Sequence, residues 1–327
     1  MMRSFLLLTL VLGACAGSPS TSIQNRQPAP DEEARQRLLQ NAAADRDTFD
    51  AVLVRLDQAM ESYAKMLSNA GAPRADAQAQ KLEKLIRETV LDEGPEYKMQ
   101  GEAPRRDLGA NYHRLQAVAI DSSQPVPQAI ALAALGFSGD MTMMPIILQG
   151  AQTSNVTLID RAVFGLAQLK CPTTPPGVLA AIAENERLPE NTRVQAAWAI
   201  YRIQDASQRQ DEIRATWRRY LTDLAEKVPT GVLVQALRGA GQSRQVDLAP
   251  IVATFLKHGA PMTRMAAADA LARMNAQDQA EALISVLDSG EPVPNVRLHV
   301  RKALQALAGD VDYGYDVTAW RMAFERG

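Results

Sequence analysis

The sequence predicts an all-α solenoid, in which helix pairs stack on one another along the chain. Alanine- and leucine-rich segments recur at a nearly constant interval, and apolar residues inside them are spaced by three or four positions. Such spacing marks one face of a helix, and such recurrence is typical of repeat proteins. Only 5% of the residues are aromatic, which favours helices packed through small side chains. The formal net charge of −2 gives no electrostatic footprint for nucleic acid.

The first fifteen residues have the pattern of an exported protein. Arg3 supplies a positive charge, an apolar run from Phe5 to Leu12 follows it, and Gly13 and Ala14 precede Cys15. This order is typical of a secretory signal, and the run is roughly half of the 20 residues that a membrane-spanning helix needs. The segment Leu12-Gly13-Ala14-Cys15 resembles the lipobox of bacterial lipoproteins.

The lipoprotein resemblance implies that residues 1–14 are a signal peptide and that Cys15 is the lipidated first residue of the mature chain. Three acyl chains on Cys15 would anchor it firmly, because each buried methylene contributes about 0.8 kcal/mol. Ala16 stands where an aspartate would imply retention in the inner membrane, so the resemblance favours the outer membrane, facing the periplasm. A cleaved signal followed by a chance cysteine is the alternative.

Two segments separate this N-terminus from the repeats. Residues 15–30 are rich in serine and proline without apolar periodicity, which predicts a flexible tether. Residues 31–92 are expected to form a helical hairpin: one long amphipathic helix from Asp31 to Leu67, a break at Gly71-Ala72-Pro73, and a second, antiparallel helix ending near Leu91.

The remaining domain, residues 105–327, contains six similar segments. They begin at Ala131 (ALAAL), Gly165 (GLAQL), Ala199 (AIYRI), Ala236 (ALRGA), Ala270 (ALARM) and Ala303 (ALQAL), at spacings of 34, 34, 37, 34 and 33 residues. The residue after each start is a large aliphatic: Leu132, Leu166, Ile200, Leu237, Leu271 and Leu304. A second apolar segment lies between consecutive starts, so we expect about six helix pairs.

The segments TRVQAAWAIYRI, TRMAAADALARM and VRLHVRKALQAL resemble the second helix of HEAT-like repeats, including those of the type found in bilin lyases. The resemblance covers residues 105–327 and implies a right-handed superhelix whose second helices line the concave face. Tetratricopeptide repeats have a similar period, but their characteristic Trp, Gly-Tyr and Pro spacing is missing. Asp312-Tyr313-Gly314-Tyr315-Asp316 and Trp320 resemble the closing segment of bacterial HEAT arrays. Trp320 and Phe324 are therefore expected to cover the apolar end of the stack, with ligand contact as the alternative.

The residue types that carry catalysis or bind metals do not form a recognisable motif. His113, His258 and His299 belong to different repeats, and neither a Gly-x-Ser-x-Gly elbow nor a phosphate-binding glycine loop is present. We therefore expect no enzyme activity, cofactor or metal site, although an active site assembled across repeats is the alternative. Once Cys15 is lipidated, Cys171 has no disulfide partner within the chain, so we expect a buried, inert thiol rather than a reactive one.

Helical geometry points to a binding surface opposite the aliphatic positions. The position before each start holds Ile130, Phe164, Trp198, Gln235, Asp269 and Lys302, and the position three after it adds Gln168, Arg202 and Arg273. We expect a partner to bind this stripe, and the candidate contacts are Ile130, Phe164, Trp198, Arg202, Arg273 and Lys302. Alternatively, neighbouring helices or the N-terminal hairpin pack on Phe164 and Trp198.

A second set of arginines stands near the start of the repeated helices. Arg193, Arg264 and Arg297 precede their repeat starts by six residues, and Arg161 precedes its own by four. In HEAT-like units this arginine hydrogen-bonds the neighbouring turn, and we expect that role here. Binding of phosphate or carboxylate groups is the alternative.

Together these features predict a membrane-anchored periplasmic scaffold that binds a protein or peptide on its concave face. One alternative is a structural module of the cell envelope, in which the hairpin drives oligomerisation or holds cell-wall glycan. A lyase-like enzyme or enzyme subunit is another, because some bacterial HEAT-like repeats occur in lyases that attach bilins. The sequence leaves open the partner, the oligomeric state and whether the lipidated end faces the periplasm or the cell exterior.

Overall fold

A computed structural model describes residues 30–45, 48–67, 73–93 and 108–325. The predicted signal peptide, Cys15 and nearly all of the tether lie outside these residues, as does most of the loop before the repeats. The described segments contain helices and no strand. None of those helices has the length and apolarity needed to cross a membrane.

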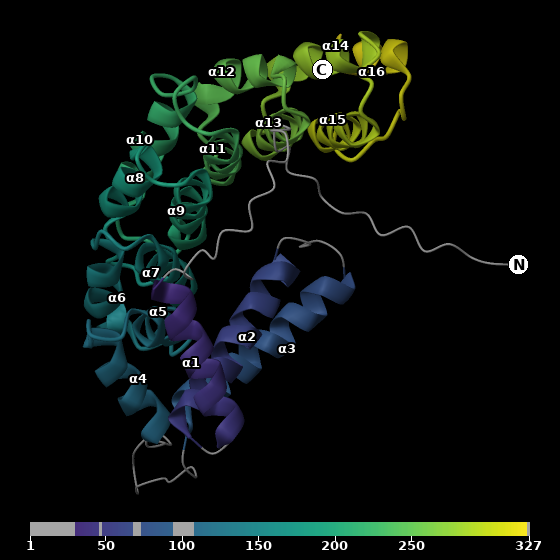
Figure 1. The fold of residues 1–327 in the computed structure, drawn as a ribbon. Coiled ribbons are helices and arrows are strands. Elements are labelled where there is room, and N and C mark those ends of the chain that lie inside the picture. The colour runs from purple at the N-terminus through teal and green to yellow at the C-terminus, as the bar shows by residue number, and fades with distance from the viewer. Residues whose placement is uncertain (1–29, 46–47, 68–72, 94–107, 326–327) are drawn as a thin grey trace, which may run out of the picture.

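Six helix pairs form a curved stack between residues 110 and 307 (Figure 1). The outer helices are α4 (Ala110–Ile120), α6 (Met144–Ala151), α8 (Pro176–Glu184), α10 (Gln210–Leu221), α12 (Ala249–Thr254) and α14 (Ala280–Asp288). The inner helices are α5 (Pro125–Leu135), α7 (Val156–Leu169), α9 (Glu190–Ile203), α11 (Thr230–Gln242), α13 (Pro261–Met274) and α15 (Pro294–Leu307). Each inner helix packs on the next, so the predicted all-α solenoid is confirmed.

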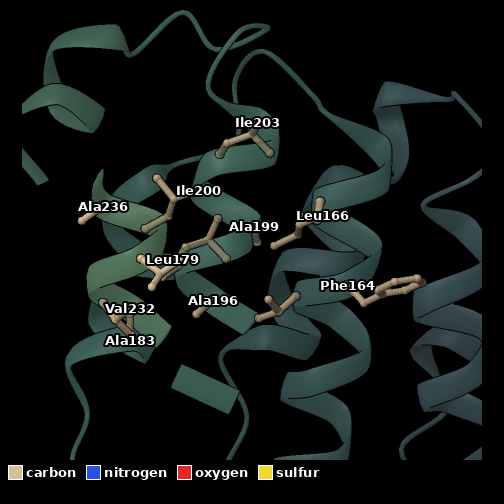
Figure 2. Close-up of a cluster of buried hydrophobic side chains, with 14 of the residues drawn as sticks. Phe164, Leu166, Leu179, Ala183, Ala196, Ala199, Ile200, Ile203, Val232 and Ala236 are labelled. Atoms are coloured by element: carbon tan, nitrogen blue, oxygen red, sulfur yellow. The ribbon is translucent and has the colours of Figure 1, made fainter. Parts of the chain in front are cut away.

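The repeated aliphatic residues form the interior of the stack. All six side chains that follow a repeat start, from Leu132 to Leu304, are 0% exposed. Small residues such as Ala162, Ala196 and Ala267 are equally buried and allow neighbouring helices to approach closely. Figure 2 shows Ile200 of α9 grouped with Leu179 of α8 and Val232 of α11. The sequence repeat is therefore one continuous apolar core.

The N-terminal segment differs from the predicted hairpin because its first helix is broken. Residues 31–67 form α1 (Pro30–Ala44) and α2 (Phe49–Leu67) instead of one helix, and α3 (Pro73–Leu91) follows. Thr48 caps α2: its hydroxyl accepts a hydrogen bond from the amide of Ala51 at 3.4 Å, and Asp50 supplies an acidic residue to the first turn. This local capping outweighs the apolar periodicity that continues across the break.

Helices α1–α3 lie inside the curve of the solenoid, where α1, α2 and α3 all pack on α5 (Figure 1). Asp57 of α2, which is 7% exposed, lies 2.6 Å from the Arg161 guanidinium of α7 and 3.3 Å from that of Arg35. Burial raises the pKa of the Asp57 carboxyl, and the two arginines oppose that shift. The Tyr63 hydroxyl donates to Gln168 Oε1 at 3.2 Å. These contacts attach the N-terminal helices to the inner face.

The C-terminal segment closes the other end of the stack. Trp320 of α16 (Val317–Glu325) is fully buried, its indole N–H donates to the Gly314 carbonyl at 3.1 Å, and Phe324 stacks at 6.4 Å. Arg301 of α15 donates to Asp312, and these hydrogen bonds lower the pKa of the Asp312 carboxyl to about 2. The aromatic residues therefore act as the predicted cap.

Candidate functional site

A groove of about 700 Å³ lies on the concave side of the middle repeats. Its walls come from α2, α7, α9, α11 and α13, so it lies between the N-terminal helices and the inner face of the solenoid. The lining residues are Ala64, Leu67, Phe164, Gln195, Trp198, Tyr201, Arg202, Gln235, Arg238, Met262, Asp269, Ala270 and Arg273. Five of them are large apolar or aromatic side chains and three are arginines, a combination that suits a binding site.

Helical spacing explains why these side chains share one face. On α9, Trp198 and Arg202 are four residues apart, and on α13 Asp269 and Arg273 have the same separation. On α11, Gln235 and Arg238 are three apart. Residues three or four positions apart lie on the same side of a helix, so each inner helix presents a short stripe to the groove.

The aromatic part of the groove packs against the N-terminal helices through Tyr63 of α2. The Trp198 ring is half-buried and stacks on Phe164 with centroids 6.1 Å apart, and the guanidinium of Arg202 lies 5.8 Å above the Trp198 ring. Phe164 in turn meets the rings of Phe137 at 5.9 Å and Tyr63 at 6.4 Å. Burial raises the pKa of the Tyr63 hydroxyl to about 12, and neighbouring Glu83 adds to the shift.

The groove carries more positive than negative charge. Among the described residues, none forms an ion pair with Arg202, Arg238 or Arg273. Asp269 is the one acidic residue in the lining, and its Oδ1 lies 2.8 Å from His299 Nδ1. The pKa of nearby Lys170 is lowered by burial and then by the charge of Arg202.

The floor of the groove contains a buried amide with an unused acceptor. Gln235 is 8% exposed, and its Oε1 accepts no hydrogen bond from the described residues. The Nε atom of Arg202 is also buried without an acceptor among them. A buried polar atom left unpaired costs about 1–3 kcal/mol, so both atoms favour a ligand that hydrogen-bonds to them.

The second half of the array matches a known family. Residues 219–308 match the family model for HEAT repeats, and they include α11, α13 and α15. This part of the chain is therefore similar to HEAT repeats. The groove extends from the matched residues into the two preceding repeats, which have the same helix-pair architecture. No curated protein matches the chain.

The six predicted contact residues divide into three groups in this HEAT-like solenoid. Trp198, Arg202 and Arg273 line the groove, where Trp198 and Arg202 are partly exposed and Arg273 is exposed. Phe164 also borders the groove but is only 8% exposed, and Ile130 is 3% exposed and outside the lining, so neither offers the exposed apolar surface predicted for it. They pack beneath the N-terminal helices, as the alternative interpretation proposed for Phe164. Lys302 is exposed on α15 but is outside the groove lining.

Tyr201 and Arg238 also line the groove, although neither belongs to the predicted binding stripe. Both stand two residues after their repeat starts, where the first, second and fifth repeats have Ala133, Ala167 and Ala272. Three of the six repeats have alanine at this position, so the large side chains of Tyr201 and Arg238 are the available signal. Leu67 and Met262 had no such signal, because the fold alone brings them to one groove.

The arginines near the helix starts have the structural role expected of HEAT-like units. Arg193 donates to the Ala183 carbonyl at 2.9 Å, and Arg264 donates to the His258 carbonyl at 2.8 Å and to Glu291 at 2.8 Å. Arg297 donates to the Glu291 carbonyl at 3.5 Å. Arg161 instead pairs with Asp57 and holds the N-terminal helices in place.

The described residues contain no cluster of three or more His, Cys, Asp or Glu side chains suited to a metal ion. Cys171 is 3% exposed, and its Sγ lies 3.2 Å from the Thr173 hydroxyl, so the thiol is part of the core. The groove lining itself offers aromatic stacking, hydrogen bonding and attraction of negative charge.

Proposed function

We propose that this chain is a non-catalytic scaffold that docks a partner protein or peptide in the concave groove. The observation that carries the proposal is the position of Trp198 beside Arg202, Arg238 and Arg273 in one groove. Aromatic and arginine side chains dominate the energetics of protein interfaces, and curved repeat arrays present many side chains to one partner.

We further propose that the scaffold is held at the outer membrane and faces the periplasm. The proposal rests on the lipobox-like segment ending at Cys15 and on the short Ser- and Pro-rich stretch that follows it. A lipidated cysteine and a tether would leave the groove free to reach a partner near the membrane surface.

The test is crosslinking in cells followed by mass spectrometry, comparing the wild type with a Trp198→Ala/Arg202→Ala double variant. We expect specific crosslinked partners to disappear from the double variant. They should persist in a matched control, Met141→Ala/Arg214→Ala, which alters exposed residues outside the groove. In the same cells, Cys15→Ala should release the protein from the membrane fraction.

Two results would contradict the docking proposal. One is an unchanged crosslinking pattern in the double variant. The other is a collapse of the thermal unfolding midpoint in Trp198→Ala alone, since Trp198 would then be a core residue whose loss disrupts the fold. Retention of Cys15→Ala in the membrane fraction would count against the anchor only.

A further inference from the structure

We infer that the groove binds an extended acidic segment of a partner protein, with carboxylate side chains at about every third residue. This inference rests on the proposed docking function and specifies the chemistry of the partner. It is carried by the charge of the groove, by the unpaired Gln235 amide and by the spacing of the arginines across three helices.

Charge complementarity selects an acidic ligand. The groove lining contains three arginines and one aspartate, whereas the whole chain has a formal net charge of −2. Asp269 is already engaged by His299, so the arginines remain available to an incoming carboxylate. The chain's own residues 16–30 contain no aspartate or glutamate, so this segment lacks the required chemistry.

The buried side-chain amide of Gln235 favours a partner segment with an extended backbone. The Gln235 Oε1 atom needs a hydrogen-bond donor, and a peptide N–H can supply one. In an α-helix nearly all backbone N–H groups are already bonded within the helix, whereas an extended polyproline II segment leaves them free. A helical partner would leave this acceptor unpaired.

The repeat geometry sets the expected acidic spacing. Arg202, Arg238 and Arg273 come from successive inner helices, α9, α11 and α13. Packed helices lie about 8–10 Å apart, and a polyproline II segment advances about 9 Å in one three-residue turn. Acidic side chains at positions i, i+3 and i+6 would therefore each face one arginine.

The apolar lining adds a second requirement. Trp198, Tyr201 and Leu67 stand beside the arginines in the same groove. A large apolar side chain between two acidic residues would contact these groups, whereas inorganic phosphate would leave them uncovered. This combination favours a peptide over a simple anion.

The test uses the purified full chain and fluorescent nine-residue probes in an anisotropy titration. The first probe has glutamate at positions 2, 5 and 8, leucine at position 4, and serine or alanine elsewhere. Its matched control replaces the three glutamates with glutamine, and a second control places the glutamates side by side. Arg202→Gln, Arg238→Gln and Gln235→Leu are compared with Arg214→Gln, which changes an exposed arginine outside the groove.

We expect the spaced acidic probe to bind at least tenfold more tightly than either control. Each groove variant should weaken that binding at least fivefold, while Arg214→Gln should leave it unchanged. Equal binding of the glutamine probe, or unaltered binding to Arg202→Gln and Arg238→Gln, would overturn the inference. Binding of phosphatidylglycerol vesicles in place of the probe, abolished by the same variants, would overturn it in favour of a lipid surface.

The two proposals can fail separately. If crosslinked partners depend on Trp198 but the acidic probe does not bind, docking stands and the acidic segment is wrong. If the partners persist in the Trp198→Ala/Arg202→Ala variant, docking in the groove is itself wrong.

Discussion

Close helix packing in the first repeats depends on two glycines that face each other's helix. A β-carbon at Gly165 of α7 would lie 2.5 Å from the Leu132 carbonyl oxygen of α5. One at Gly136, just after α5, would lie 2.3 Å from the Gly165 carbonyl oxygen. Neither distance is compatible with a side chain, so both positions need glycine because backbone meets backbone there.

Gly165→Ala is therefore expected to destabilise the protein by about 1–3 kcal/mol, because overpacking outweighs the gain in helix propensity of about 1 kcal/mol. Gly177 of α8 provides the control, since a β-carbon there meets nothing within 4 Å. Gly177→Ala should be neutral or stabilising by up to about 1 kcal/mol. Urea unfolding followed by circular dichroism measures both, and equal effects would show that the close contact does not matter.

At the scale of elements, the three N-terminal helices determine which part of the concave surface is exposed. They cover the inner face beside α5 and α7, and α2 supplies Leu67 to one wall of the groove. Their attachment depends on Asp57, whose side chain is 10% exposed, and on Arg161. A buried carboxylate without its partner is costly, so this ion pair helps to hold the layer on the solenoid.

Arg161→Gln should destabilise the N-terminal layer by about 1–3 kcal/mol at neutral pH. Hydrogen exchange should accelerate in α1 and α2 and stay unchanged in α11. Arg37→Gln is the control, because Arg37 is 75% exposed in its pair with Glu33, and its effect should stay below about 0.5 kcal/mol. Unchanged exchange in α2 would show that Arg161 does not hold the layer.

The effect of Arg161→Gln should also depend on pH. Burial raises the pKa of the Asp57 carboxyl, and removal of Arg161 raises it further. A raised carboxyl pKa contributes stability that is present below the ordinary value of 3.8 and lost as pH rises through the folded-state pKa. The deficit of the variant should therefore be largest near neutral pH and shrink in acid.

For the whole molecule, the linear arrangement of repeats makes stability local. Each helix pair contacts its neighbours and few distant elements. A substitution that destabilises the repeats at one end should therefore leave the stability of the other end unchanged. The two ends are protected differently: α1–α3 pack inside the curve at one end, and α16 covers the last pair at the other (Figure 1).

Trp320→Ala should expose the last repeat and cost about 3–5 kcal/mol of local stability. Hydrogen exchange should accelerate in α14 and α15 and remain at wild-type rates in α5 and α7. Val311→Ala, at a position 48% exposed in the same segment, should leave all four helices unchanged. Equally faster hydrogen exchange in all four helices would contradict the expectation that the stability of each repeat depends only on its neighbours.

The repeats could be predicted because the signal for each helix is local. Leu132 and its five counterparts follow the helical period, and the structure buries every one of them. The break between α1 and α2 was missed because Thr48 is a short capping signal within a long periodic stretch. The concave position of Trp198, Arg202 and Arg273 could be predicted for the same reason, because they lie on the groove-facing sides of α9 and α13.

Spacing along the chain is enough to predict the helix pairs, their approximate number and the aliphatic core. Which concave positions stay open depends on packing between distant segments, so only the three-dimensional fold reveals them. Tyr63 buries Phe164 from about one hundred residues away, and Leu67 meets the groove that Met262 also lines. Periodicity shows which way a side chain points, but long-range packing determines what covers it.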